Sequence, residues 1–408
     1  RTTAVLRLAS LNMKGHGPST AGPASDKWLK INQIVREMRT AVLALQETHL
    51  DDNHVETLHE LFGKRIHVFH SPLPNRANTA AGVAFVLNKE RVDVSQAEVL
   101  ELIPGRALLL TLRWHQTVSI RILNVYAPNS ATENAHFWTT LQHLFEDDAA
   151  PKPDVILGDF NIVEDPLDRL PVRPDNAPAA RALADLHTYL DLEDTWREQH
   201  PSTRAYTYIQ DHGTALSRLD RIYLSQKWAR EAADWLINDI AGIPSDHMMV
   251  AVSLSDKDVP YVGTGRWVVP KAVLADYQFT AYVKQQGNRL LSDIPDPAHR
   301  TAQYNAQTLY QEFKANILSD ARKRAKVNIP KLIRRIAKLK TARATMLNTP
   351  EPRDEGYIST EAAVLQQRIK DLETRRFGTA RKTVALNDWI FGEKINKPWI
   401  ATNKPKAP

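Results

Sequence analysis

The sequence predicts a layered α/β fold followed by a basic, mainly helical extension, and three observations support this. Apolar strand-like runs alternate with amphipathic helical patterns over the first 256 residues. Several strand-like runs follow one another with no helix between them, which requires mixed sheets packed face to face between helices. Beyond residue 257 the sequence changes to long, basic helical patterns. With 408 residues, of which 43% are hydrophobic, the chain can build more than one core.

The strands and helices can be assigned in order along the first half of the chain. The run 4–11 predicts a strand that ends at Asn12, and Asp26 caps an amphipathic helical pattern over residues 26–40. Residues 41–46 predict a buried strand that ends at Glu47. Further strands are expected at 81–87, 107–114, 117–126 and 153–161, helices at 132–146 and near 177–190, and short strands at 206–209, 218–224 and 248–254.

The charge distribution divides the chain near residue 257. Residues 257–408 contain 28 Lys and Arg against 14 Asp and Glu, whereas residues 1–256 contain 25 against 33. An acidic region that binds a polyanion needs a cation between them, which indicates a metal site. We therefore expect one domain at 1–256, a linker and extended arm at 257–301, and a basic helical connector at 302–408. Pro330 should break the first connector helix, and residues 348–360 should turn the chain into a helical hairpin.

Composition also excludes several classes of site. The absence of cysteine rules out disulfides, thiolate zinc sites and cysteine nucleophiles. No apolar run approaches the roughly 18 residues of a membrane helix, so we expect a soluble chain with no membrane partner. The chain starts at Arg1 rather than at a methionine, which suggests a segment of a longer polypeptide.

Polar residues at the ends of the predicted strands could hydrolyse a phosphodiester. This reaction needs a held divalent cation, a positioned water and donors to the phosphoryl oxygens. Asp220 lies within the apolar segment RLDRIY, where a carboxylate needs a partner such as a histidine. Taken singly, each candidate also has an ordinary interpretation as a turn, strand end or surface residue. The other candidates are Asn12 in SLNMKG, Glu47 in LALQETH, Tyr126 and Asn129 in NVYAPN, Asp159 and Asn161 in GDFN, and Asp246 and His247 in SDH.

The order of these motifs resembles the endonuclease/exonuclease/phosphatase superfamily over about residues 5–255. This family includes DNase I, abasic-site endonucleases, inositol polyphosphate phosphatases and sphingomyelinases, and it implies a four-layered α/β/β/α sandwich. The segments DLEDTWREQHPSTRAYTY and ALSRLDRIYLS narrow the resemblance to the endonuclease of LINE-type (non-LTR) retrotransposons. Arg169 lies ten residues after Asp159, and Thr207 lies thirteen residues before Asp220, as in that group. GRWVVP and FGEKINKPWIATNKPKAP resemble the connector to a reverse transcriptase.

The resemblance implies a role for each candidate. Glu47 would be the principal ligand of Mg²⁺ or Mn²⁺, with Asn12 and Asp246 as further ligands or neighbours. Asp159 would orient or deprotonate the attacking water, and Asn161 would position the water or the phosphate. His247, held by Asp220, would donate to the scissile phosphate, as would Tyr126 and Asn129. The implied DNA contacts are Arg169, Thr207, Ser217, Arg218 and Ser245.

The implied activity is nicking of DNA to leave a 3′-hydroxyl and a 5′-phosphate, the hydroxyl then priming reverse transcription. DNA would be the substrate, element RNA a possible ligand of the basic extension, and a reverse transcriptase a domain of the same polypeptide, in the nucleus. The alternatives are an abasic-site repair endonuclease, a lipid or inositol phosphatase, and a nucleic-acid-binding module without activity. Lys14 favours the last, because related repair enzymes carry an acid or amide there and an ammonium cannot ligate a cation.

Overall fold

The computed structural model describes residues 5–15, 26–114, 118–210, 215–240, 243, 245–255, 269, 271–274, 276–294, 300–328, 330–348 and 355–391. These residues form two compact units. The first unit comprises residues 1–262 together with 340–408, and the second comprises residues 263–339. The chain enters the second unit at Gly263 and returns to the first unit at Lys340.

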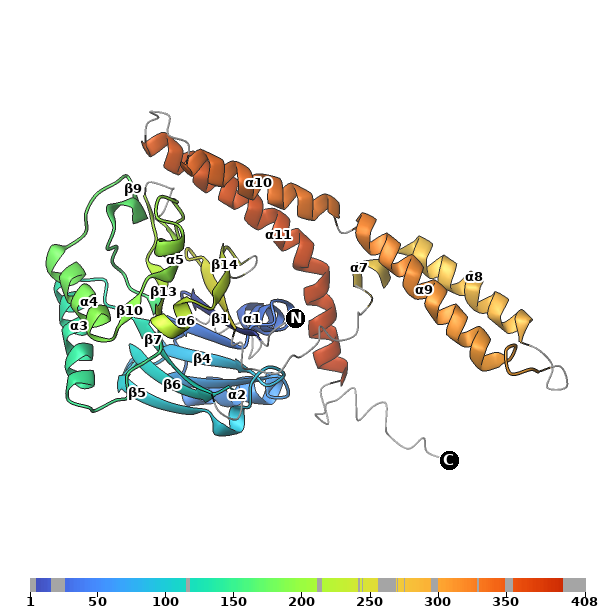
Figure 1. Ribbon diagram of the computed structural model, residues 1–408, viewed down its shortest axis with the longest axis horizontal. Coiled ribbons are helices and arrows are strands. Elements are labelled where there is room, and N and C mark those ends of the chain that lie inside the picture. The colour runs from blue at the N-terminus through green and yellow to red at the C-terminus, as the bar shows by residue number, and fades with distance from the viewer. Residues whose placement is uncertain are drawn as a thin grey trace. The chain divides into compact units, whose positions relative to one another are not determined.

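Two six-stranded mixed sheets form the centre of the first unit (Figure 1). The first sheet has the order β14-β15-β1-β2-β4-β3 and consists of β1 (Val5–Asn12), β2 (Val42–Gln46), β3 (Ile66–Ser71), β4 (Val83–Asn88), β14 (Ala232–Asn238) and β15 (Met249–Ser255). The second has the order β10-β13-β8-β7-β6-β5 and consists of β5 (Glu98–Ile103), β6 (Ala107–Arg113), β7 (Ser119–Tyr126), β8 (Val155–Asp159), β10 (Leu192–Glu193) and β13 (Asp220–Ser225). A small third sheet joins β9 (Arg169–Leu170), β11 (Tyr208–Ile209) and β12 (Leu216–Ser217).

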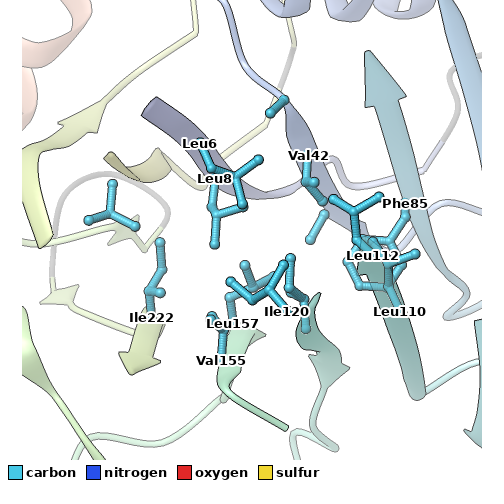
Figure 2. Packing of buried hydrophobic residues seen from close by; sticks show 14 of the residues in the cluster. Leu6, Leu8, Val42, Phe85, Leu110, Leu112, Ile120, Val155, Leu157 and Ile222 are labelled. Carbon is cyan, nitrogen blue, oxygen red and sulfur yellow. The ribbon is translucent and has the colours of Figure 1, made fainter. Parts of the chain in front are cut away.

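The two large sheets pack face to face through a continuous apolar core. Figure 2 shows Leu8 and Val42 of the first sheet facing Leu157 and Ile222 of the second. These side chains are almost completely buried. The residues two positions away on the same strands belong to the same core, which is the period of a half-buried strand: Leu6, Ala44, Val155 and Leu224. Fully burying such a side chain contributes about 1.5–3 kcal/mol, so this layer holds the sheets in fixed register.

A helical layer covers the outer face of each sheet. The first sheet is covered by α1 (Asp26–Glu37) and α2 (Asp52–Phe62), and Trp28 and Leu58 pack against it. The second is covered by α3 (Ala131–Glu146) and α4 (Ala177–Tyr189), where Trp138 is completely buried. The short helices α5 (Thr195–Gln199) and α6 (Gln226–Ala229) lie in connections. The α/β/β/α sandwich expected from the sequence is confirmed.

Strand direction brings the ends of distant segments to one edge of the sandwich. The pairs β1–β2 and β7–β8 are parallel, with Asn12 opposite Gln46 and Tyr126 opposite Asp159. The antiparallel strands β13 and β15 begin at this same edge, with Asp220 opposite Asp159. Strand ends and strand starts therefore meet there, and the loops that leave this edge can assemble a site on a rigid support.

The helical part of the chain differs in detail from the expected arm and connector. Residues predicted as an extended arm instead include α7 (Lys271–Leu274) and α8 (Tyr277–Asp293), whose first turn is capped by the Asp276 carboxylate accepting from the Gln278 N–H at 2.9 Å. In the second unit α8 packs on α9 (Ala306–Asn328) around Phe279 and Ala321. The next helices are α10 (Pro330–Asn348) and α11 (Glu355–Phe391), so a helix begins at Pro330 as expected.

Several elements of the first unit were not expected from the sequence: strands β3, β5, β9, β10, β12 and β14, and helices α2, α5 and α6. Strands β3, β5 and β14 lie at the edges of their sheets, where burial is incomplete and the apolar pattern is weak. Helix α2 follows Asp51, whose carboxylate accepts from the His54 N–H at 2.8 Å. In the described parts of the chain, no helix combines the length and the apolar character needed to cross a membrane.

Candidate active site

An amide at the end of β1 joins the two sheets at the common edge. Asn12 is completely buried, and its Nδ2 donates to Glu47 Oε1 and to Asp159 Oδ2, each at 2.8 Å. Glu47 follows β2 of the first sheet, and Asp159 ends β8 of the second. One side chain thus fixes the distance between two carboxylates that are 112 positions apart in the sequence. Beneath it, Gln46 Nε2 donates to Asn124 Oδ1 at 2.7 Å, which supplies a second polar link between the sheets.

His247 lies between two buried carboxylates. Its Nδ1 is 2.8 Å from Asp220 Oδ2, and its Nε2 is 3.8 Å from Asp159 Oδ2. Burial lowers the pKa of His247, but the charges of Asp220 and Asp159 outweigh this and raise it. For Asp159, burial raises the pKa of the carboxyl, although the positive charge of His247 acts to lower it. The predicted pairing of Asp220 with a histidine is therefore observed as geometry, and it presents an imidazole edge toward Asp159.

Hydrogen bonds between side chains and the backbone fix the segments that carry Asp220 and His247. The buried Thr207 Oγ1 accepts from the Leu219 and Asp220 N–H groups, both at 3.0 Å. Ser245 Oγ donates to the Asn12 carbonyl at 2.8 Å and accepts from the His247 N–H at 3.1 Å. The loop that carries His247 is thereby connected to the end of β1.

The backbone at the site includes unusual conformations. Glu47 and Asn161 have φ angles of 48° and 49°, in the left-handed region that non-glycine residues rarely adopt. Such residues are stable only where the surrounding structure holds them, as at the ends of these packed strands. Gly158 has a φ of 149°, and a Cβ there would lie 2.0 Å from the Val125 carbonyl oxygen of β7. The glycine of GDFN is therefore required for the close pairing of β7 and β8.

Two further predicted residues frame the site from the second sheet. Tyr126 is largely buried and hydrogen-bonds Glu47, and burial together with the charge of Glu47 raises the pKa of its hydroxyl well above the usual range. Asn161 Nδ2 donates to the Ala127 carbonyl at 2.9 Å, and its N–H donates to Asp159 Oδ1 at 3.0 Å. Asn129 is exposed in the connection between β7 and α3. Tyr126 and Asn161 thus belong to the assembled group, whereas Asn129 lies in the loop beside it.

The oxygen atoms near Glu47 are of the type that binds a hard divalent cation. Of the three residues expected to bind it, however, only Glu47 is suitably oriented. Carboxylate and amide oxygens are the ligands that Mg²⁺ and Mn²⁺ prefer. Asn12, however, directs its nitrogen toward Glu47, and its oxygen accepts from the Lys14 N–H at 3.0 Å. The Lys14 ammonium forms an ion pair with Asp246 Oδ2 at 2.8 Å. The half-buried Glu47 carboxylate is therefore the best-placed ligand of the three expected residues.

Among the described residues, one other group has the spacing of a metal site. Ligand atoms of Asp159, Asp220 and His247 lie within 4.8 Å of one another. His247 Nδ1 is already engaged by Asp220, and a histidine flanked by two carboxylates favours its protonated form, which binds no metal. We therefore interpret this group as a hydrogen-bonded relay rather than as a cation site.

The expected DNA contacts are mostly buried. Thr207, Ser217 and Arg218 have at most 6% exposure, so they cannot touch a duplex in this structure. Arg218 is held by Asp168 and Asp194, at 2.7 and 2.5 Å. Buried polar and charged groups need hydrogen-bonding partners inside the protein, as the two carboxylates are for Arg218. These three residues therefore have a structural role beneath the surface of the site.

The other two expected contacts lie nearer the surface. Arg169 pairs with Asp175 at 2.6 Å and keeps 14% of its side chain exposed. Ser245 is half-buried. The guanidinium of Arg169 is therefore the one member of the expected set that combines positive charge with solvent access.

Two basic residues near the site were missed from the sequence. Arg106 follows Gly105 at the turn between β5 and β6, and its guanidinium lies 4.7 Å from the centre of the Tyr126 ring. The buried Lys27 donates to the carbonyls of Met13 and Gly15, both at 2.7 Å, and so fixes the loop after β1. Neither is part of a recognisable local motif, so only the tertiary structure associates them with the site.

Comparison with known proteins agrees with this architecture. Residues 9–247 match the Endonuclease/Exonuclease/phosphatase family. The chain belongs to this family. It is thus a member of a family of hydrolases that comprises nucleases and phosphatases, as the ordered motifs predicted. Over 235 residues it is 31% identical to the Transposon TX1 uncharacterized 149 kDa protein of Xenopus laevis, a match that covers 56% of this chain and 17% of that protein.

Solved structures similar to this chain include two nucleases of different kinds. An AP endonuclease from Archaeoglobus fulgidus is 18% identical, with a TM-score of 0.48, over 60% of this chain and 98% of the other. The endonuclease domain of TRAS1, a telomere-specific non-LTR retrotransposon, is 15% identical, with a TM-score of 0.42, over 62% of this chain and 98% of the other. The resemblance to transposon proteins expected from the sequence is confirmed, and the chain spans about a sixth of the length of its Xenopus relative.

Proposed function

We propose that this chain is a divalent-metal-dependent endonuclease that nicks DNA and leaves a 3′-hydroxyl and a 5′-phosphate. One observation carries the proposal: the buried His247 is held by Asp220 at 2.8 Å and directed toward Asp159, beside the Glu47 carboxylate. This edge offers a base, a charged donor and a metal ligand within one group of strand ends. Phosphodiester hydrolysis requires all three.

In the proposed reaction a water attacks the phosphorus and the bond from phosphorus to the 3′ oxygen breaks. Asp159 accepts the proton of the water, while Asn161 orients the water or a phosphoryl oxygen. His247 donates a hydrogen bond to the developing negative charge on the phosphate, and Tyr126 donates from the opposite side. The departing 3′ oxygen gains a proton and becomes the hydroxyl, and the 5′ side keeps the phosphate.

Glu47 would hold the divalent cation, which supplies charge neutralisation and polarises the phosphate when bound. Asn12 keeps the carboxylate of Glu47 in place through its 2.8 Å hydrogen bond. The guanidinium of Arg106, over the ring of Tyr126, would contact a backbone phosphate, as would that of Arg169.

The similarity to a transposon protein supports a role in target-primed reverse transcription. The 3′-hydroxyl left by the nick would prime synthesis by a reverse transcriptase of the same polypeptide, which would place the protein in the nucleus. The excess of Lys and Arg in residues 257–408 supports binding of DNA or of element RNA there.

A nicking assay on supercoiled plasmid with Mg²⁺ tests the proposal. We expect wild type to produce open circles, Glu47→Gln and His247→Ala to be inactive, and the surface variant Asp185→Asn on α4 to match wild type. Equal nicking of intact and abasic-site duplexes supports the proposed nicking endonuclease, whereas cleavage of the abasic duplex alone would identify a repair endonuclease. Release of inorganic phosphate from inositol polyphosphates would instead indicate a phosphatase.

One observation favours a nucleic-acid-binding module without activity. The Lys14 ammonium pairs with Asp246 and so neutralises a carboxylate of the site. If wild type binds duplex DNA but nicks no plasmid with Mg²⁺ or Mn²⁺, this second function replaces the first.

A further inference from the structure

We propose that helices α10 and α11 are a working part of the nuclease, because they position the segment that carries Asp246 and His247. This inference rests on the proposed function for its catalytic consequence. The geometry itself lies entirely within the first compact unit, which includes residues 340–408. The last strand of the sandwich ends at Ser255, and α10 and α11 begin 75 and 100 residues later.

Side chains of α11 bond to two points of the connection between β14 and β15. Gln366 Nε2 donates to Asp239 Oδ2 at 3.1 Å, just after β14. One turn further along the helix, Lys370 Nζ donates to the Ser245 carbonyl at 3.4 Å, immediately before Asp246. Residues four apart lie on one face of a helix, so α11 presents these two donors together.

The second half of α10 reinforces the same segment. Lys340 Nζ donates to Asn238 Oδ1 at 2.9 Å, at the last residue of β14. Arg343 lies 3.9 Å from the sulfur of Met248, the residue after His247. Lys340 also pairs with Glu373 of α11 at 2.8 Å, so the two helices act on the segment as one body.

The buried carboxylate of Asp239 depends on this docking. Burial raises its pKa, and the opposing influences include the charges of Lys370 and Arg343 and the hydrogen bond from Gln366. All three of those side chains belong to α10 or α11. An acidic side chain buried in this way needs such partners, so the buried position of Asp239 depends on the presence of the helices.

An apolar contact extends the docking to the small third sheet. Leu347, Ile358 and Ala362 pack against Leu170 and Leu216, which neighbour Arg169 and Ser217. Beside it, Asn348 pairs with the backbone of Arg204, accepting from its N–H at 2.7 Å and donating to its carbonyl at 3.3 Å. The helices therefore also support strands β9 and β12 of the third sheet and the backbone at Arg204.

The inference is tested in the full chain with the double variant Lys370→Met and Gln366→Leu, which keeps most of the apolar part of each side chain but removes both donors. The matched control is Gln367→Leu with Arg368→Met, at neighbouring exposed positions of α11. Displacement of a catalytic group by about 1 Å can lower a rate up to roughly a hundredfold. We expect kcat for nicking to fall at least tenfold in the double variant, with KM for DNA within twofold, and Lys370→Arg with Gln366 retained to restore the rate.

A second readout does not depend on activity. We expect the amides of His247 and Met248, both hydrogen-bonded, to exchange with deuterium faster in the double variant than in the control. Unchanged exchange at these amides would overturn the inference, as would a raised KM with unchanged kcat, which would assign α11 to DNA binding. If wild type nicks no DNA, the proposed function fails, but faster exchange in the double variant would still establish the positioning contact.

Discussion

Replacing Asp220 by asparagine separates the support of His247 from every other feature of the site. The two side chains have nearly the same shape, and Asp220 is 1% exposed, so the variant changes charge without opening a cavity or touching DNA. The backbone anchors are kept, because Thr207 Oγ1 accepts from the N–H of residue 220 rather than from its side chain. The perturbation therefore removes the 2.8 Å contact between Asp220 Oδ2 and His247 Nδ1, together with a negative charge that also acts on Asp159.

The size of the effect follows from the strength of that contact. A hydrogen bond to a charged group contributes about 1.5–3 kcal/mol, and each 1.4 kcal/mol of barrier changes a rate about tenfold. Loss of about 2–3 kcal/mol in the transition state predicts that kcat for nicking falls about 30-fold to 150-fold. KM for DNA should remain within twofold, because the changed atom is buried behind the histidine.

The assay is steady-state nicking of a labelled duplex with Mg²⁺, with Asp185→Asn as the control for loss of one surface charge. Far-UV circular dichroism and thermal unfolding establish that the variant is folded. A kcat within twofold of wild type would refute the role assigned to Asp220. A raised KM with unchanged kcat would refute it equally, because it would mean that Asp220 acts on substrate binding.

Three further predictions concern the supports of the site. Gly158→Ala should reduce both stability and nicking, because its Cβ would meet the Val125 carbonyl oxygen at 2.0 Å; a wild-type thermal midpoint would contradict this. Arg218→Lys should lower stability by about 3 kcal/mol in urea unfolding without altering KM for DNA, since it breaks a buried pairing with Asp168; a raised KM alone would instead identify a DNA contact. Burial raises the pKa of Glu164, but its hydrogen bonds and the charge of Arg221 lower it from 4.5 to about 2. That contribution, about 3 kcal/mol, is complete above about pH 4.5 and is lost as pH falls toward 2, so Glu164→Gln should flatten the loss of stability over this range.

Much of the sandwich could be predicted because its signals are local. The runs before Asn12 and Glu47 and the run ending in GDFN have the length and apolar character of buried strands, and each is a strand in the structure. Helical periodicity likewise located α3 and α4. Edge strands such as β5 escaped prediction because their exposed faces weaken the apolar pattern.

The site could be predicted as a set of residues but not as a geometry. The motif order indicated that Asp159, Asp220 and His247 belong together, and the structure brings them within 4.8 Å. Motif order cannot distinguish a buried support from an exposed contact, so Thr207 and Arg218 were placed at the DNA although their side chains are enclosed by packing. That distinction depends on tertiary packing.

The contacts of α10 and α11 with the sandwich could not be predicted from the sequence either. The basic composition of residues 302–408 predicted helices and a connector, but it does not specify which face meets another surface. Lys340 and Lys370 counted there as part of a nucleic-acid-binding charge, whereas the structure bonds them to Asn238 and Ser245. A charged residue on a helix can thus serve a neighbouring loop as readily as a ligand.

The chemistry at the nick tests the central claim most directly. Plasmid nicked by wild type with Mg²⁺ is treated with DNA ligase, and separately with a DNA polymerase, with parallel reactions in EDTA and with Glu47→Gln. The account predicts nicks that ligase reseals and polymerase extends, as a 3′-hydroxyl and a 5′-phosphate require, and no nicks in EDTA or with the variant. Nicks that resist ligation, or equal nicking by wild type and Glu47→Gln, would contradict it.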